Sequence, residues 1–172
     1  MKKIVTSILI SSIALFALNI GEVPKEITLS GKNGGLVDGS PWNSSMLRDK
    51  IYVLFYVDPD KKSDNDKFID ALHQKHYNLE KYGSVAIINL KATWLPNFAI
   101  EKKLKTKQKE FPNTIYAKDK TKYLVKQWQL ADDSANVLIF DKQGKLLYQH
   151  IGKMSRDEMQ KAFALIESHL ND

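Results

Sequence analysis

The chain has 172 residues and a formal net charge of +6, with 26 Lys and Arg residues against 20 Asp and Glu residues, and it contains no cysteine. This length is enough for one domain with a substantial core, and the hydrophobic (43%) and charged (27%) fractions are ordinary for a globular protein, so wholly disordered and collagen-like classes are excluded. The absence of cysteine excludes disulfides, thiol nucleophiles and Cys-ligated zinc or iron–sulfur clusters.

The N-terminal segment has the pattern of a secretory signal. Two lysines precede an apolar stretch at residues 4–20, which is close to the minimum length that crosses a bilayer. We expect residues 1–20 to be a signal peptide, with an uncleaved anchor as the alternative, and residues 21–172 to form one domain in the periplasm. Without its first twenty residues the chain loses two lysines and no acid, so its charge falls to +4. A block at residues 101–126 accounts for all of that remaining basicity.

The first half of the expected domain begins with short strands. Residues 27–29 and 36–37 are strand candidates separated by a Gly-rich turn, a pattern that predicts an N-terminal β-hairpin. Residues 51–57 (IYVLFYV) form a continuous run of β-branched and aromatic side chains. Such a run predicts a central strand that is buried on both faces of a sheet.

Helices and strands alternate along the rest of the chain. We expect Ser63 to be the N-cap of a helix that continues to about Glu80, because apolar residues recur there every three or four positions. The later segments predict a strand at 85–90, a helix at 98–110, a strand at 114–117, a short helix at 123–128, a β-hairpin at 137–150 and a final helix with a capping box at 155–158. This order predicts an α/β thioredoxin-like sandwich, with a central mixed sheet flanked by helices and an N-terminal β-hairpin extension.

Parts of the sequence also resemble a known family. The run at 51–57 resembles the start of an extracytoplasmic thioredoxin-like domain of the peroxiredoxin and thiol-reductase type. The segment 120–148, which contains Trp128-Gln129-Leu130 and the stretch VLIFDKQGK, is similar to the bacterial YtfJ family of small periplasmic thioredoxin-like proteins, whose function is unsettled. Redox thioredoxins carry a Cys-x-x-Cys pair after the central strand and a cis-proline before a later strand. Here residues 58–63 and 134–136 occupy those places, without cysteine or proline at the matching positions. Cysteine-based redox catalysis is therefore excluded.

The same resemblance implies where a binding surface lies, because in this fold the two loops are neighbours. The candidate surface residues are Asp58, Asp60, Ser63, Ser134, Ala135 and Asn136, with Trp94 as an exposed aromatic side chain in another loop. The expected function is a non-catalytic module that binds an envelope protein or peptide, with no metal and no cofactor.

An enzymatic alternative rests on the pair Asp58 and Asp60. Two aspartates directly after a buried strand resemble the opening motif of haloacid-dehalogenase-like phosphohydrolases, in which the first is a nucleophile and both help to hold magnesium. Lys62 stands where that family has threonine or valine, which disfavours this interpretation.

Histidines and lysines provide two further alternatives. His73, His76 and Glu80 fall near one side of the expected helix, but their spacing is a loose match to a zinc site, and we expect ordinary polar residues there. The lysines of residues 102–109 spread around most of their helix, which argues against nucleic-acid binding. Association with anionic membrane surfaces, as an envelope structural protein, remains the third hypothesis.

Overall fold

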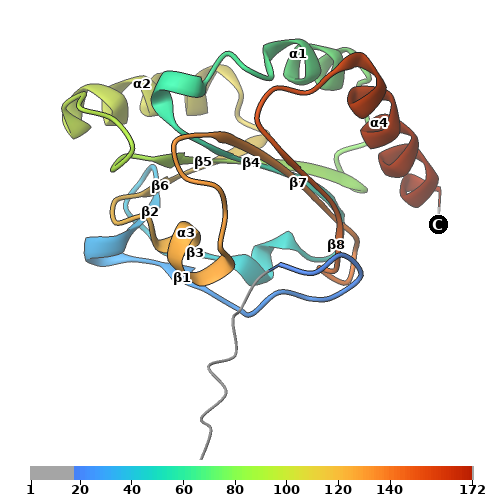
Figure 1. The fold of residues 1–172 in the computed structure, drawn as a ribbon, viewed down its shortest axis with the longest axis horizontal. Coiled ribbons are helices and arrows are strands. Elements are labelled where there is room, and N and C mark those ends of the chain that lie inside the picture. The colour runs from blue at the N-terminus through green and yellow to red at the C-terminus, as the bar shows by residue number, and fades with distance from the viewer. Residues whose placement is uncertain (1–17, 172) are drawn as a thin grey trace, which may run out of the picture.

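The computed structural model describes residues 18–171, which form a six-stranded mixed sheet with helices on both faces (Figure 1). The strands, in their order across the sheet, are β2 (Gly34–Leu36), β6 (Thr114–Asp119), β5 (Tyr82–Asn89), β4 (Ile51–Val57), β7 (Ala135–Phe140) and β8 (Leu146–Ile151). Strands β4, β5 and β6 are parallel, and the other three are antiparallel to their neighbours. The predicted mixed sheet with a central strand at 51–57 is confirmed.

Two layers cover this sheet (Figure 1). One face carries the helices α1 (Asp66–Gln74), α2 (Asn97–Glu110) and α4 (Arg156–Leu170). The other face carries α3 (Tyr123–Trp128) and a two-stranded sheet of β1 (Thr28–Leu29) and β3 (Trp42–Asn43). Short 3-10 turns at Gly31–Asn33, Ser44–Leu47 and Pro59–Lys61 complete the chain.

The predicted signal peptide or anchor lies almost wholly outside the described residues, since only residues 18–20 of it are included. Between residues 18 and 171, no helix is long and apolar enough to cross a membrane.

The central strand β4 explains why its sequence is apolar at every position. Leu54 and Tyr56 face the core that contains Trp42 and Trp128. Alternate side chains of the same strand face the core beneath α1 and α4, including Phe55. Because successive side chains of a strand point to opposite faces, a strand covered on both sides needs apolar residues throughout.

The last helix begins as the sequence predicts. The Ser155 hydroxyl accepts a hydrogen bond from the Glu158 N–H (3.3 Å), and the Glu158 carboxylate accepts one from the Ser155 N–H (2.6 Å), which forms the capping box of α4. We expect Ser155→Ala to lower the free energy of unfolding by about 1 kcal/mol, measured by urea denaturation. Ser155→Asp, which keeps an acceptor at the N-cap, is the control, and equal losses in the two variants would contradict the capping role.

The N-terminal hairpin prediction was wrong in its pairing. Strand β1 pairs with β3, and β2 instead joins the edge of the main sheet beside β6. The glycines that predicted a turn instead allow two strands to approach each other closely. Gly34 has φ 129°, and a Cβ at this position would clash with the Lys118 carbonyl.

The first helix is also shorter than predicted. It ends at Gln74, and His76 has the left-handed φ of 47°, where the chain turns back toward β5. Ser63 is not its N-cap; the helix follows Asn65, whose side chain donates to the Gly152 carbonyl (3.0 Å) and accepts from the Met154 N–H (2.9 Å). A tertiary contact with the segment before α4 therefore determines where α1 begins, and local capping chemistry does not.

Candidate functional site

Polar residues collect at one edge of the main sheet. Asp58 directly follows β4, Asn89 ends β5 and Asp119 ends β6. Parallel strands finish at the same edge, and the antiparallel strand β7 starts there with Ala135 and Asn136. All five residues are buried. Buried polar groups require partners, so the hydrogen bonds at this edge define what the site is.

The loops after β4 and before β7 are joined directly. The Asp58 N–H donates to the Ser134 carbonyl (3.0 Å), and the Asp58 carboxylate accepts from the Asp60 N–H (2.8 Å). Burial of the side chain, assisted by the charges of Asp60 and Asp133, raises the pKa of the Asp58 carboxyl above its ordinary value. The predicted proximity of these two loops is therefore present, and Asp58 shapes the first of them.

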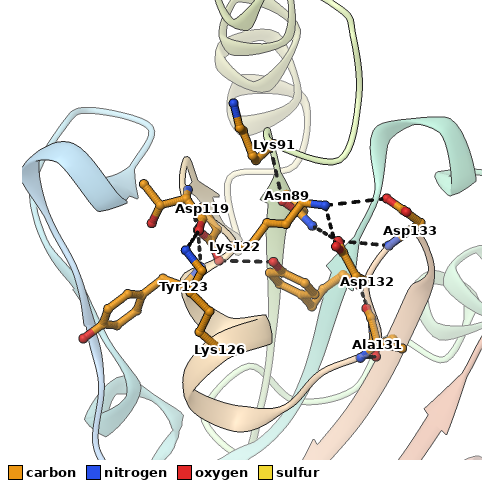
Figure 2. A network of polar contacts seen from close by, with 12 residues as sticks. Asn89, Lys91, Asp119, Lys122, Tyr123, Lys126, Ala131, Asp132 and Asp133 are labelled. Carbon is orange, nitrogen blue, oxygen red and sulfur yellow. Dashed lines mark hydrogen bonds and ion pairs between the residues drawn. The ribbon is translucent and has the colours of Figure 1, made fainter.

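Beside these loops lies an ion pair that the sequence did not indicate (Figure 2). The Lys122 ammonium contacts the Asp132 carboxylate and lies 3.9 Å from the Asp133 carboxylate. Asn89 donates to the other oxygen of Asp132 (3.0 Å) and accepts from the Lys91 N–H (3.3 Å). Lys122 thus ties the segment before β7 to the start of α3, and Asn89 ties the same segment to the end of β5.

This pairing changes the acidity of both partners. Burial alone would raise the pKa of Asp132, but its ion pair with Lys122 and its hydrogen bonds from Asp133 and Asn89 outweigh burial and lower it. The hydrogen bond to Asp132 likewise raises the pKa of Lys122, so both groups stay charged across the neutral pH range.

A pH series tests this ion pair. Because the pKa of Asp132 is lower in the folded state, the pair stabilises the fold above the unfolded-state pKa of about 3.9, and this contribution is lost as the pH falls through the folded-state value. We expect wild type to exceed Asp132→Asn in unfolding free energy at neutral pH and the difference to shrink in acid, measured by urea denaturation. In a Lys122→Met background the difference should be smaller throughout; an unchanged difference would contradict the pairing.

Two buried side chains, those of Asp119 and Asn136, connect the segments of this edge through hydrogen bonds. The Asp119 carboxylate accepts four hydrogen bonds: from the N–H groups of Thr121, Tyr123 and Leu124 and from the Tyr56 hydroxyl (3.1 Å). Burial, with a further contribution from Asp119, raises the pKa of Tyr56, so its hydroxyl remains a donor. This carboxylate anchors the start of α3 and has no free acceptor direction toward solvent.

Asn136 plays the same role on the other side. Its side chain accepts from the Ala131 N–H (3.0 Å) and donates to the carbonyls of Ala131 (2.9 Å) and Tyr56 (3.3 Å). Both Ala135 and Asn136 are buried, so their side chains support the predicted surface and do not form its accessible part.

The other predicted surface residues are accessible but divided. Asp60 and Ser63 are exposed beside the loop that Asp58 organises. Trp94 lies in the segment between β5 and α2 and is 86% exposed, but no hydrogen bond or ring contact of the described structure joins it to Asp58 or Ser134. The structure therefore brings the two loops together and leaves Trp94 as a separate feature.

The described residues do not provide the ligand geometry of either metal site considered from the sequence, which were magnesium at Asp58 and Asp60 and zinc on the helix of His73. Asp58 is buried and already accepts the Asp60 N–H. His73 lies in α1, whereas His76 lies beyond its end, so the single helical face on which the zinc interpretation depended is absent. Within residues 18–171, no three His, Asp or Glu side chains gather closely enough to hold a metal ion.

The two histidines instead line a groove of about 390 Å³ at the opposite edge of the sheet. The His73 ring packs against Phe111 with 5.0 Å between centroids, and Tyr77 packs against Tyr82 at 5.2 Å. Aromatic packing accounts for His73 and Tyr77. The groove shares no lining residue with the polar edge described above.

Comparison with known proteins identifies the family. The family model of a bacterial protein of unknown function (YtfJ_HI0045) matches residues 19–169. The chain belongs to this family. An uncharacterized protein from Haemophilus influenzae is 26% identical over 144 residues, covering 82% of this chain and 77% of that protein. The uncharacterized protein YtfJ of Escherichia coli K12 is 24% identical over 133 residues, covering 75% and 72%. The predicted YtfJ membership is confirmed.

Solved structures similar to this YtfJ_HI0045 chain are thioredoxin-like. The exposed lipoprotein thioredoxin of Streptococcus pneumoniae matches with a TM-score of 0.56 at 16% identity, covering 82% of this chain and 99% of that one. A thiol-disulfide isomerase from Corynebacterium glutamicum matches with a TM-score of 0.60 at 14% identity, covering 85% and 97%. Identities this low establish the fold alone, and they confirm the predicted thioredoxin-like class.

The polar edge of this YtfJ_HI0045 member is where its sequence departs from redox thioredoxins. The segment after β4 carries Asp58 and Asp60 in place of a Cys-x-x-Cys pair, and none of the peptide bonds in the described residues is cis. Hydrogen bonds and an ion pair connect the loops at this edge. The result is a thioredoxin-like fold without thiol chemistry.

Proposed function

We propose that this protein is a non-catalytic module of the cell envelope that binds a protein or peptide at the edge formed by the loops 58–63 and 131–134. The observation that carries the proposal is the direct hydrogen bond between Asp58 and Ser134, which joins two segments 76 positions apart into one continuous surface. The Lys122–Asp132 pair extends that surface toward β5.

The supporting network makes this surface a good binding platform. Asn136 and Asp119 anchor it from beneath with all their polar atoms used internally. A surface held in one conformation before binding loses little conformational entropy when a partner docks. Exposed groups of both signs, with Asp60 followed by Lys61 and Lys62, provide charge selectivity without a reactive group.

A location outside the cytoplasm is part of the proposal. It rests on the sequence of residues 1–20, in which lysines precede an apolar stretch as in secretory signals. The cysteine-free domain folds without oxidation or thiol protection, so it suits an oxidising compartment as well as a reducing one.

Site-directed crosslinking tests the proposed surface. A photoreactive amino acid is placed at Ser63, and the full chain is irradiated in envelope extract, with Glu80 as the matched control position on the opposite edge of the sheet. We expect a discrete crosslinked partner from Ser63 that does not appear from Glu80. Identical products from the two positions would count against this surface.

A charge reversal then measures specificity. Asp60→Lys should weaken capture of that partner about tenfold, because a rim charge facing a complementary partner typically changes affinity by this order. Glu80→Lys makes the same charge change at an exposed position elsewhere and should leave capture unchanged. Equal effects of both variants would indicate general electrostatics and would contradict a specific site.

A further inference from the structure

The outward face of α2 aligns three lysines behind an aromatic end. Phe98, Lys102, Lys105 and Lys109 are spaced four, three and four residues apart, which places them in one row along a helix. All four are exposed. Ile100 and Leu104 form the buried, opposite side. The lysines of this helix therefore include a defined row within the positive charge that is spread around the helix.

The acidic residues of α2 pair with lysines outside this row. Glu101 pairs with Lys118 (3.8 Å) and Lys120 (3.2 Å), which belong to β6 and the residue after it. Glu110 pairs with Lys107 (3.0 Å). By contrast, Lys102, Lys105 and Lys109 form no ion pair within residues 18–171. The row thus presents three uncompensated positive charges to solvent.

Two exposed aromatic side chains lie near the start of α2, Phe98 in its first turn and Trp94 in the loop just before it. Trp94 is 86% exposed and Phe98 is 76% exposed, and they have the highest exposures of the large hydrophobic side chains in the described part of the chain. Single exposed hydrophobic residues are ordinary, but two aromatic rings four positions apart beside a cationic row form a combined feature. Tryptophan favours the boundary between the headgroups and the acyl chains of a bilayer.

We propose that Trp94, Phe98 and the lysine row of α2 form a docking surface for an anionic lipid bilayer. A helix of 14 residues is about 21 Å long, so α2 lying flat brings all three lysines to the headgroups while the rings enter the interface. The charge complements anionic headgroups, and the sequence of residues 1–20, in which lysines precede an apolar stretch, has the pattern of a segment that is delivered to a membrane. A nucleic-acid strand is the less favoured partner because the row lies on the convex surface of a single helix.

Tryptophan fluorescence provides a readout at the proposed surface itself. Trp42 is fully buried and Trp128 is 1% exposed, so Trp94 alone of the three tryptophans is accessible to lipid. The full chain is mixed with phosphatidylglycerol–phosphatidylcholine vesicles carrying brominated acyl chains, and with phosphatidylcholine vesicles alone. We expect a blue shift and bromine quenching on the anionic vesicles, both reversed by salt, and neither in Trp94→Phe. Residues 1–20 contain no tryptophan, so the signal reports on Trp94 and not on the environment of the N-terminal segment.

Two triple variants with the same charge change distinguish recognition of the lysine row from an effect of net charge on vesicle binding. Lys102→Gln/Lys105→Gln/Lys109→Gln should weaken vesicle binding, followed by Trp94 quenching, about a hundredfold. The control replaces Lys145, Lys153 and Lys161 by glutamine; these three lysines are exposed around β8 and α4. Figure 1 places α4 and α2 at opposite ends of the helical layer. The control should bind like wild type.

Three results would overturn the proposal. The first is the absence of quenching by brominated chains in anionic vesicles. The second is an equal loss of binding in both triple variants, which would show that net charge and not the row is recognised. The third is a Trp94 shift with single-stranded nucleic acid but not with vesicles, which would assign the surface to a different partner.

Discussion

Replacing Asp119 by asparagine lowers the free energy of unfolding by about 3 kcal/mol, because an amide cannot accept the four hydrogen bonds that the carboxylate accepts. The donors to Asp119 are the N–H groups of Thr121, Tyr123 and Leu124 and the hydroxyl of Tyr56, and the residue is fully buried. In Asp119→Asn an NH₂ group faces one pair of these donors, which then lack an acceptor in a site closed to water. Urea denaturation followed by circular dichroism measures the loss.

Asp133→Asn is the matched control for this prediction. Its side chain is 71% exposed and lies 3.9 Å from the Lys122 ammonium, so the same chemical change should cost no more than about 0.5 kcal/mol. If Asp119→Asn unfolded at the same urea concentration as Asp133→Asn, the buried network would not stabilise the edge of the sheet as described.

Replacing Trp128 by alanine lowers the free energy of unfolding by about 4 kcal/mol, since it leaves a large cavity in the core beneath α3. The indole is 1% exposed, packs edge-on against Trp42 with 6.5 Å between ring centroids and lies 6.2 Å from the Phe140 ring. Its Nε1–H also donates to the Lys25 carbonyl (2.8 Å), which ties the N-terminal segment to α3. Urea denaturation again provides the measurement.

Two variants separate packing from the hydrogen bond. Trp94→Ala removes the same side chain at an 86% exposed position and should stay within about 0.5 kcal/mol of wild type. Trp128→Phe keeps a ring in the core but loses the bond to Lys25, so its stability should lie between those of wild type and Trp128→Ala. A Trp128→Ala variant as stable as Trp94→Ala would contradict the assignment of Trp128 to the core.

Much of the fold was predictable because local pattern and tertiary role agree. The run at 51–57 is apolar at every position since both of its faces are covered, and the Ser155–Glu158 capping box is complete within four residues. The first helix was predicted less well. Its apolar spacing continued toward Glu80, but the chain leaves the helix at Gln74 so that β5 can pair with β4 from Tyr82 onward.

The candidate site was predictable to the extent that topology determines it. The proximity of the loops at Asp58 and Ser134 follows from the antiparallel pairing of β7 with β4, and the family resemblance implied it. The Lys122–Asp132 pair was missed, because it depends on a lysine with the left-handed φ of 56° before α3 and on an asparagine at the end of β5. No spacing rule within the sequence connects these positions.

The sequence alone determined that this protein has no thiol chemistry, since a missing residue type is missing in every conformation. It also determined the central strand and the last helix, whose periodicity and capping are local properties. Only the tertiary structure decided how the edge without thiols is built, with Asp119 and Asn136 as buried anchors and Lys122 paired to Asp132. The reason is physical: a buried polar side chain must find its partners in three dimensions, and those partners come from strands and loops that are distant in the chain.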